Sequence, residues 1–375
     1  MLKIVADDKI PFLEGVLEPF ATVHYLPGKD IKNKSLKGVD ALLIRTRTKC
    51  TSELLKGTSV KFIGTATIGF DHIDTGYCNS HGITWKNAPG CNSSSVQQYI
   101  LASLLKMAHE FRFSLKEKTL GIVGVGNVGS KVEQAAGILG MRVLLNDPPR
   151  ERYEGTGSFS SFEKLISEAD IISLHVPLKV VGEDRTYHMI NVKSIRKMKK
   201  GTWLINSSRG EVADTSAVKQ GLKTGRLAGA VIDVWEHEPD IDRELMQESF
   251  IATPHIAGYS TDGKANGTAS VVNQLSEHFG LPLKTWYPDS LPQPEDPLIE
   301  IAAKDESTEE ILRITVGHTY NISEDDLRLR FSPSDFEKQR GNYPLRREFS
   351  AYTVKFTGKH LIAGEWLKKL GFVIS

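Results

Sequence analysis

The chain has 375 residues, of which 40% are hydrophobic, and this length suits two or three domains with sizeable cores. Its 47 basic and 46 acidic residues leave a formal net charge of +1, which excludes the strongly basic surface of a typical nucleic-acid-binding protein and gives no attraction to a membrane surface. No apolar run approaches the ~18 residues that span a bilayer. The N-terminus carries Asp7 and Asp8 where a secretory signal needs apolar residues.

The three cysteines indicate a reducing cellular compartment. Cys50, Cys78 and Cys91 have no spacing typical of metal ligands, so buried spectator thiols explain them better than a metal site. We expect a soluble cytoplasmic protein that has no bound metal and no nucleic-acid or membrane partner.

Short apolar strands alternate with amphipathic helices over about the first 280 residues, which is typical of doubly wound α/β sheets. A basic loop, Arg45-Thr46-Arg47-Thr48-Lys49, follows the third strand, and its hydroxyls and cations suit a carboxylate or a phosphate. A solvated basic turn would explain Arg47 and Lys49 equally well. The strands expected in this first part are 2–5, 21–25, 40–44 and 61–64.

The run from Ser94 to Phe113 predicts one long helix that bridges a first domain and a second. The strand 119–123 then enters a turn with three glycines. Gly124 permits the tight turn, Gly126 lets the backbone approach a pyrophosphate, and Gly129 lets the next helix pack on the sheet. The unpaired N–H groups at the start of that helix favour a phosphate.

The strand 142–146 delivers Asp147 roughly 20 residues beyond the glycine turn. A carboxylate there accepts both ribose hydroxyls of NAD and repels the 2′-phosphate of NADP. The order of strand, glycine turn, helix, second strand and acid therefore predicts NAD binding rather than a plain tight turn.

Polar residues follow three later strands of the nucleotide half. Arg209, Glu238 and His255 each come after an apolar run, and ligands of open α/β sheets lie outside the carboxyl ends of the strands. We therefore expect these three side chains in one crevice. The three strands concerned are expected at 202–206, 229–234 and 250–253, and a further strand of this half is expected at 170–175.

The three residue types suit the oxidation of a secondary alcohol. An imidazole such as that of His255 can accept the hydroxyl proton near neutral pH. A carboxylate such as Glu238 fixes the ring tautomer and stabilises the imidazolium, and a guanidinium such as Arg209 holds a substrate carboxylate. Each residue alone has an ordinary structural explanation, but their shared placement favours a catalytic site.

The C-terminal part differs in composition. A long helix from about Ser260 to Phe279 is expected to return to the first domain, which is then discontinuous in sequence. Four prolines predict a stiff extended linker, at positions Pro288, Pro292, Pro294 and Pro297.

Beyond the linker, the segments Ser307 to Glu310 and Ser334 to Glu337 resemble capping boxes, and 351–357 alternates with strand period. A small α/β unit of about 80 residues is marginal as an independent core, so a dimerisation role is favoured over a free-standing binding module. Arg346 and Arg347 of this unit are candidates to reach a substrate phosphate, but a surface role is favoured for both.

Several motifs together resemble the D-isomer-specific 2-hydroxyacid dehydrogenases over about the first 280 residues. Besides the glycine turn they are His175-Val176-Pro177-Leu178, Asn206-x-x-Arg209-Gly210, Asp233-x-x-x-x-Glu238-Pro239 and Pro254-His255-Ile256-Ala257-Gly258. The resemblance implies two Rossmann-like lobes with a cleft between them. It also implies NAD as the cofactor.

Further segments are similar to a narrower group of these enzymes, which adds a C-terminal unit of about 90 residues that forms the dimer contact. This closer resemblance implies oxidation of 4-phospho-D-erythronate to (R)-3-hydroxy-2-oxo-4-phosphooxybutanoate on the bacterial route to pyridoxal 5′-phosphate. It also implies a homodimer. The segments that carry it are 64–72, 87–92, 146–150 and 255–260.

Roles for individual residues follow from the matched motifs. The resemblance implies that Arg209 and Glu238 are active-site residues and that His255 donates and accepts the proton. Substrate contacts are implied for Thr46, Thr67 and Tyr259, although Tyr259 would also be unremarkable as a buried aromatic residue. Cofactor contacts are expected from Gly124, Gly126, Asn127, Val128, Gly129, Asp147, Ser207, Ser208, Arg209, Asp233 and Gly258.

Two positions depart from the family pattern. Val176 stands where the family commonly has threonine, which removes a hydroxyl contact to the cofactor. Thr46 stands where close relatives tend to have serine, and it keeps the hydroxyl.

The expected domains are a substrate-binding lid (1–93 and 256–285), an NAD-binding Rossmann domain (94–255) and a C-terminal dimerisation domain (286–375). Two other functions stay open. One is a dehydrogenase of another D-2-hydroxy acid, such as 3-phosphoglycerate. The other is a non-catalytic, NADH-sensing dimer.

Overall fold

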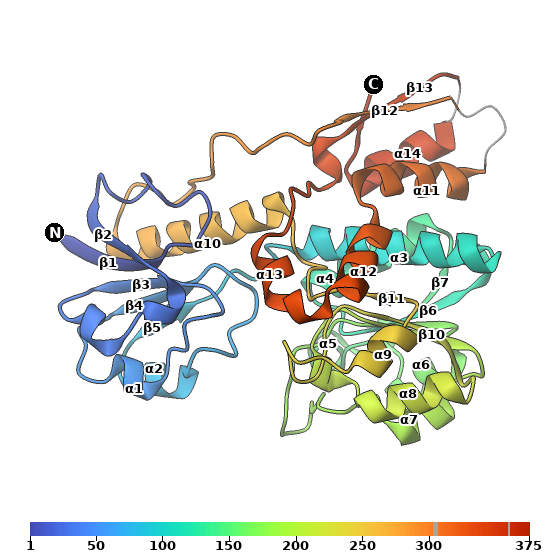
Figure 1. Ribbon diagram of the computed structural model, residues 1–375, viewed down its shortest axis with the longest axis horizontal. Helices are drawn as coiled ribbons and strands as arrows, with labels where there is room; N and C mark the ends of the chain where they lie inside the picture. The colour runs from blue at the N-terminus through green and yellow to red at the C-terminus, as the bar shows by residue number, and fades with distance from the viewer. Residues whose placement is uncertain (303–306, 359–360) are drawn as a thin grey trace. The chain divides into compact units, whose positions relative to one another are not determined.

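The computed structural model describes residues 1–302, 307–358 and 361–375. The chain forms two compact units, one of Met1–Asn92 with Ser260–Pro292 and one of Ser93–Tyr259 with Gln293–Ser375. Parallel sheets flanked by helices build both units, so the predicted α/β fold class is confirmed (Figure 1).

The first unit is a five-stranded parallel sheet of strand order β2-β1-β3-β4-β5. Both of its faces are buried, as parallel sheets require: Val5 packs into one core, while Ile4 and Ala6 pack into another that also takes Val272 and Leu275 from α10. The elements are β1 (Leu2–Asp7), β2 (Ala21–Leu26), β3 (Ala41–Ile44), α1 (Ser52–Leu55), β4 (Phe62–Thr65), α2 (Thr75–Ser80), β5 (Thr84–Lys86) and α10 (Thr261–Phe279).

The second unit contains a six-stranded parallel sheet of order β11-β10-β9-β8-β6-β7. The chain leaves β6 toward β7 on one side and returns to β8 on the other, so the strand order reverses between β6 and β8. Ligands of doubly wound sheets bind at such a reversal. The strands are β6 (Thr119–Val123), β7 (Arg142–Asn146), β8 (Ile171–Leu174), β9 (Thr202–Asn206), β10 (Leu227–Ile232) and β11 (Ile251–Ala252).

Helices cover this sheet through two hydrophobic cores. The long helix expected from residue 94 is α3 (Ser93–Phe111), which packs against α4. The remaining helices that flank the sheet are α4 (Asn127–Ile138), α5 (Pro148–Glu154), α6 (Phe162–Glu168), α7 (Val192–Lys197), α8 (Thr215–Lys223) and α9 (Arg243–Glu248).

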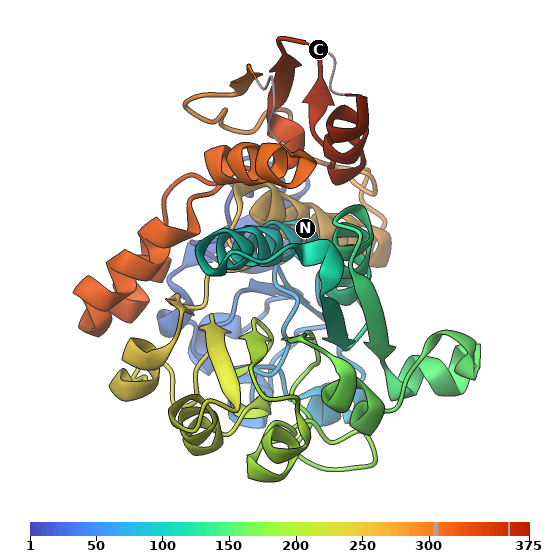
Figure 2. The same cartoon turned by 90° about the vertical axis from the view of Figure 1, so that its right-hand side faces the viewer.

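The C-terminal part adds a three-stranded parallel sheet of order β12-β13-β14. Its helix α11 lies along α3 (Figure 2), and Leu312 and Val316 of α11 share one core with Tyr99 and Ile100 of α3. The C-terminal part is therefore continuous with the nucleotide half of the unit. Its elements are β12 (Leu298–Ile301), α11 (Thr308–Thr319), α12 (Ile322–Phe331), α13 (Phe336–Gly341), β13 (Thr353–Phe356), α14 (Leu361–Leu370) and β14 (Val373–Ile374).

The expected strands are found within two residues of their predicted ends, and the proline-rich segment 281–297 forms neither helix nor strand. Ser307 caps α11 by accepting the Glu310 N–H, as predicted. The second capping box is wrong, because Ser334 lies inside a 3-10 turn and α13 starts only at Phe336.

The surface location expected for two arginines is also wrong. Arg346 is 4% exposed and Arg347 7% exposed. Arg346 is buried because its guanidinium donates hydrogen bonds to groups far away in the sequence. Within the described residues, the model contains no helix that is both long and apolar enough to cross a membrane.

Candidate active site

The glycine turn joins the end of β6 to the start of α4. Gly124 has φ +87°, and a Cβ on Gly129 would lie 2.0 Å from the Gly124 carbonyl oxygen, so both positions need glycine for internal reasons. A Cβ on Gly126, by contrast, would meet no atom within 4 Å among the described residues. Close approach by a ligand would explain that third glycine, and a pyrophosphate requires such an approach.

The first turn of α4 faces the same place. Gly126 is its N-cap and supplies no side-chain hydrogen bond, so no side chain at the cap satisfies the N–H groups that follow from Asn127 and Val128. Such a helix start favours a bound phosphate. The residues present therefore fit the pyrophosphate of a dinucleotide.

Asp147 follows β7 directly beside the glycine turn. Its Oδ2 accepts the Val125 N–H at 2.8 Å, and its Oδ1 accepts the Arg150 N–H at 3.1 Å, which caps α5. Each carboxylate oxygen keeps a second acceptor position. The acid is thus fixed by the turn and can still accept ribose hydroxyls.

The loop after β9 is organised by Asn206. Its Oδ1 accepts the N–H and the hydroxyl of Ser208, and its Nδ2 donates to the Arg209 carbonyl at 3.0 Å. The hydroxyl of Ser207 is buried and has no hydrogen-bond partner among the described residues. A buried hydroxyl of this kind is costly unless a ligand pairs with it.

His175 directly follows the neighbouring strand β8. Burial lowers the pKa of His175 to about 3, so its imidazole is neutral. Its Nε2 contacts the Ser173 hydroxyl at 2.9 Å, while its buried Nδ1 pairs with no described residue. Val176 packs against the core and contributes no hydroxyl. Unpaired buried groups at the ends of β8 and β9 thus accompany the glycine turn, as a site for a polar cofactor requires.

Arg209, Glu238 and His255 line one pocket of about 240 Å³. The loops that carry Arg209 and Glu238 are in close backbone contact, since a Cβ on Gly210 would lie 2.0 Å from the Trp235 carbonyl carbon. The His255 N–H donates to the Asp233 carbonyl at 2.7 Å, which joins the third loop to the second. The structure therefore brings together the three residues that sequence reasoning expected in one crevice.

Glu238 and His255 are directly paired. The His255 Nδ1 lies 2.8 Å from Glu238 Oε2, and Glu238 Oε1 accepts the Trp235 N–H at 2.9 Å. Burial alone would raise the pKa of Glu238, but the charge and hydrogen bond of His255, the Trp235 N–H and the charge of Arg340 together hold it below its ordinary value. The carboxylate is therefore ionised at neutral pH and keeps a proton on Nδ1, which leaves Nε2 as the basic nitrogen.

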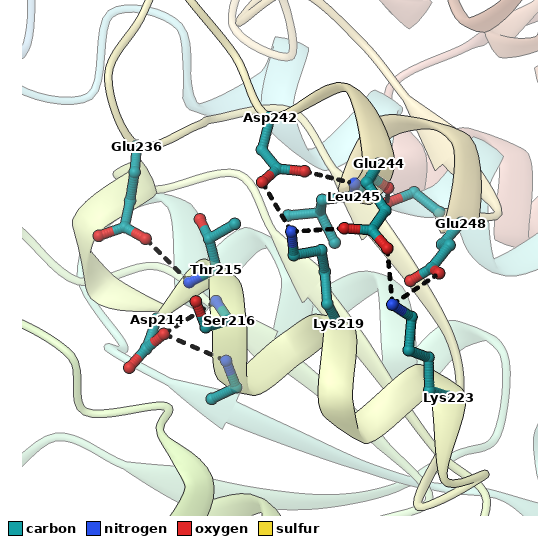
Figure 3. Close-up of polar contacts among 12 residues, drawn as sticks. Asp214, Thr215, Ser216, Lys219, Lys223, Glu236, Asp242, Glu244, Leu245 and Glu248 are labelled. Carbon is teal, nitrogen blue, oxygen red and sulfur yellow. Dashed lines mark hydrogen bonds and ion pairs between the residues drawn. The ribbon is translucent and has the colours of Figure 1, made fainter.

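The segment before Glu238 is anchored by Glu236. Its Oε2 accepts the Thr215 N–H at the start of α8, and its Oε1 contacts His188 Nε2 at 2.7 Å. Figure 3 shows Glu236 beside the capped start of α8. The same helix is joined to α9 by Lys219, whose Nζ contacts Asp242 and Glu244. The loop that carries Glu238 is thus fixed at a helix start.

Asp233 is buried behind His255. Its Oδ1 accepts the Thr253 hydroxyl and the Ile256 N–H, and its Oδ2 accepts the Ala257 N–H at 2.9 Å. Burial raises the pKa of Asp233, against the opposing charge of His255 and these hydrogen bonds. The residue predicted to contact the cofactor therefore also fixes the His255 loop. Gly258 and Tyr259 continue this loop and are half-buried.

Thr46 and Thr67 belong to the first unit, where they follow the adjacent strands β3 and β4. Thr46 is exposed, and the Thr67 hydroxyl contacts the Thr65 hydroxyl and donates to the Gly69 carbonyl. The structure places these two residues at one end of the first sheet.

Sequence reasoning missed Lys264 of α10. Burial and the nearby charge of Arg45 lower the pKa of Lys264, so two cations gather at the end of β3. No motif marks Lys264, since a lysine in a long helix normally faces solvent. Sequence reasoning also missed the anchoring role of Glu236 and the buried arginine treated below.

Two family models match the chain. Residues 93–257 match the D-isomer-specific 2-hydroxyacid dehydrogenase, NAD binding domain. Residues 291–371 match a domain of unknown function, DUF3410.

Curated relatives cover nearly the whole chain. Erythronate-4-phosphate dehydrogenase of Bacteroides thetaiotaomicron is 50% identical over 94% of this chain and 99% of its own length. Erythronate-4-phosphate dehydrogenase of Photorhabdus laumondii is 39% identical over 99% of each chain.

Solved structures support the same fold and cofactor. The D-lactate dehydrogenase of Aquifex aeolicus, solved with NAD and lactic acid, superposes with a TM-score of 0.61 at 26% identity, over 77% of this chain and all of that one. A D-lactate dehydrogenase of Treponema pallidum gives a TM-score of 0.60 at 25% identity, over 76% of this chain and 99% of the other. The chain is thus an NAD-dependent dehydrogenase, and it belongs to the erythronate-4-phosphate dehydrogenase family of D-isomer-specific 2-hydroxyacid dehydrogenases.

Proposed function

We propose that the chain oxidises 4-phospho-D-erythronate at C2 to (R)-3-hydroxy-2-oxo-4-phosphooxybutanoate with NAD, a step on the route to pyridoxal 5′-phosphate. The names of the relatives that match the full chain support the substrate. The observation that carries the reaction is the pocket in which Arg209 stands with the hydrogen-bonded pair of Glu238 and His255.

The pair of Glu238 and His255 moves the proton. Because Glu238 holds the proton of Nδ1, the Nε2 of His255 is free to accept the proton of the C2 hydroxyl as the C2–H bond breaks. The imidazolium formed in this step is stabilised by the carboxylate 2.8 Å away. His255 returns the proton to solvent after the product leaves.

Arg209 binds the substrate carboxylate. A planar guanidinium matches a carboxylate with two parallel hydrogen bonds and polarises the forming C2 carbonyl. When bound, NAD supplies the hydride acceptor. Its proposed contacts are the glycine turn with Asn127 and Val128, the carboxylates of Asp147 and Asp233, the segment Ser207 to Arg209, and Gly258.

Thr46, Thr67 and Tyr259 are proposed as substrate contacts, and Arg45 and Lys264 add positive charge beside Thr46 that suits a phosphate. The proposed roles are substrate binding for 1–93 and 256–285, NAD binding for 94–255 and dimerisation for 286–375.

We further propose a homodimer that acts in the cytoplasm. The outer face of α12 supports the dimer, because Leu327 and Phe331 are 63% and 91% exposed there, and exposed apolar patches mark contact surfaces. Three free cysteines support a reducing compartment. Sedimentation of the wild type and of Phe331→Glu tests the dimer; a wild-type monomer contradicts it.

A substrate panel tests the reaction. NADH formation is expected with 4-phospho-D-erythronate, with a much lower kcat/KM for 3-phosphoglycerate and D-lactate. Arg209→Ala should lose most of the turnover. Faster turnover of 3-phosphoglycerate would favour the alternative dehydrogenase, and NADH binding without turnover of any acid would favour the sensing dimer.

A further inference from the structure

A buried arginine of the C-terminal part reaches the catalytic loop. The Nε of Arg346 donates to Gln98 Oε1 at 2.8 Å and its Nη2 donates to the Ser95 carbonyl at 2.6 Å, both on α3. Its Nη1 lies 3.4 Å from the carbonyl oxygens of Ile256 and Ala257. All three nitrogens of the guanidinium therefore face acceptors from the nucleotide half.

The two carbonyls belong to the residues that directly follow His255. The N–H groups of Ile256 and Ala257 are bound by the Asp233 carboxylate at 2.8 and 2.9 Å. The peptide segment after His255 is thus held by a buried carboxyl group at its N–H groups and by a buried guanidinium at its carbonyl groups.

The Asp233 carboxyl group and the Arg346 guanidinium are connected by a buried network. Thr253 Oγ1 donates to Asp233 Oδ1 at 2.6 Å and lies 2.8 Å from the Tyr99 hydroxyl. The Tyr99 ring lies 6.3 Å from the Tyr320 ring, over which the Arg346 guanidinium stacks at 3.8 Å. The network supports the backbone on either side of His255. Its members come from the nucleotide half (Asp233, Thr253 and Tyr99) and from the C-terminal part (Tyr320 and Arg346).

His255 needs such support. Its φ is +56°, a left-handed conformation that a residue other than glycine keeps only where the surroundings impose it. Glu238 fixes the imidazole, but it does not fix the backbone. The backbone is fixed by Asp233, whose carbonyl also accepts the His255 N–H at 2.7 Å, and by the guanidinium behind the next two residues.

We propose that Arg346 is a positioning residue of the active site, which holds the Ile256 and Ala257 carbonyls and so keeps the His255 imidazole aligned with Glu238 and the substrate. The proposal rests on the proposed function for its kinetic readout. It gives the C-terminal domain a part in catalysis within its own chain, in addition to any contact with a second copy.

Kinetics of Arg346→Met and Arg346→Lys test the proposal, at a temperature where circular dichroism shows both folded. We expect kcat with 4-phospho-D-erythronate to fall about 10- to 100-fold in Arg346→Met, with partial recovery in Arg346→Lys, while the Kd for NADH changes less than about threefold. Two controls separate positioning from stability. Arg313→Met removes another C-terminal arginine, paired with Glu310, and Val354→Ala weakens the C-terminal core. Both should keep kcat within about twofold.

A spectroscopic readout does not depend on the substrate. In wild-type protein the Nδ1 proton of His255, hydrogen-bonded to Glu238, should give a downfield proton NMR signal that vanishes in His255→Asn. The signal should broaden or shift in Arg346→Met and stay in both controls. If the wild type turns over no hydroxy acid, the proposed function fails while this signal still tests the positioning.

An unchanged signal together with a kcat within twofold of wild type in folded Arg346→Met would overturn the proposal. If Arg346→Met does not fold, Arg346→Lys and Gln98→Leu decide by the same criteria, because Gln98→Leu removes the Nε acceptor while leaving the charge in place.

Discussion

The glycine turn and the His255 loop are both functional loops of the second unit, but they are held in different ways. The turn is fixed by residues at most 22 positions apart in the sequence: Gly129 packs on Gly124, and Asp147 binds the Val125 N–H. The His255 loop is held by Tyr99 through Thr253, by Asp233, and by Arg346, which lies 91 residues away from His255. The contacts that support a loop can be predicted from sequence when its partners lie close by in the chain. They cannot be predicted when the partners lie about 90 or more residues away, as Tyr99 and Arg346 do.

The largest expected effect is a loss of kcat on substitution of His255, with NADH binding at the glycine turn left unchanged. His255→Asn should lower kcat about 10³-fold, because the proton acceptor is lost while asparagine tolerates the positive φ. The Kd for NADH, measured by fluorescence titration, should stay within about threefold. Loss of NADH binding in this variant would contradict the separation.

Substitutions in the glycine turn should instead weaken NADH binding. Gly129→Ala places a Cβ against the Gly124 carbonyl, so unfolding should become easier by about 1–3 kcal/mol and the Kd for NADH should rise at least tenfold. The matched variant Gly126→Ala meets no protein atom within 4 Å, so it should weaken NADH binding while its Tm stays unchanged. A Tm loss in Gly126→Ala equal to that in Gly129→Ala would refute this reading of the turn.

Glu238→Gln tests the effect of the Glu238 negative charge on His255. We expect kcat to fall about 10- to 100-fold, since an amide stabilises the imidazolium poorly. Because the folded pKa of Glu238 lies below its ordinary 4.5, its contribution to stability is present above about pH 4.5 and is lost as pH falls through the lower folded value.

The wild type should therefore be more stable than Glu238→Gln at pH 7, and this difference in the free energy of unfolding should shrink below pH 4.5. Urea unfolding of both proteins between pH 3.5 and 7 checks the sign, with roughly unit steps in pH. A difference that grows toward acid would show that the carboxylate is not stabilised in the folded state.

The smallest effect on kcat is expected for Thr253, which supports the His255 loop from behind. Thr253→Val removes the hydroxyl between Tyr99 and Asp233, so the free energy of unfolding should fall by about 1–3 kcal/mol and kcat by only a few fold. Chemical denaturation and steady-state kinetics measure both. An unchanged stability would mean that this bridge does not hold the loop.

The sheet strands and the glycine turn could be predicted because local patterns specify them. Apolar runs end in turn residues, and the spacing of Gly124, Gly126 and Gly129 has a steric reason within the turn itself. The grouping of Arg209, Glu238 and His255 could be expected for a different reason, since parallel strands deliver their carboxyl ends to one edge of the sheet.

The location of Arg346 could not be predicted, because its acceptors on Ser95 and Gln98 lie about 250 residues away and an Arg-Arg pair after Pro344-Leu345 is typical of a surface loop. The structural role of Asp233 could not be predicted for a different reason: its partners are backbone N–H groups, which no side-chain pattern marks. Lys264 is half-buried by tertiary packing that helix periodicity does not reveal.

The claim that Glu238 and His255 act as one proton-transfer unit is tested most directly by kcat in Glu238→Ala, His255→Ala and the double variant, assayed as NADH formation from 4-phospho-D-erythronate. Residues that act together are strongly non-additive. We predict that the double variant turns over within about threefold of His255→Ala. A double variant slowed by the product of the two single losses would show two independent contributions and contradict the account.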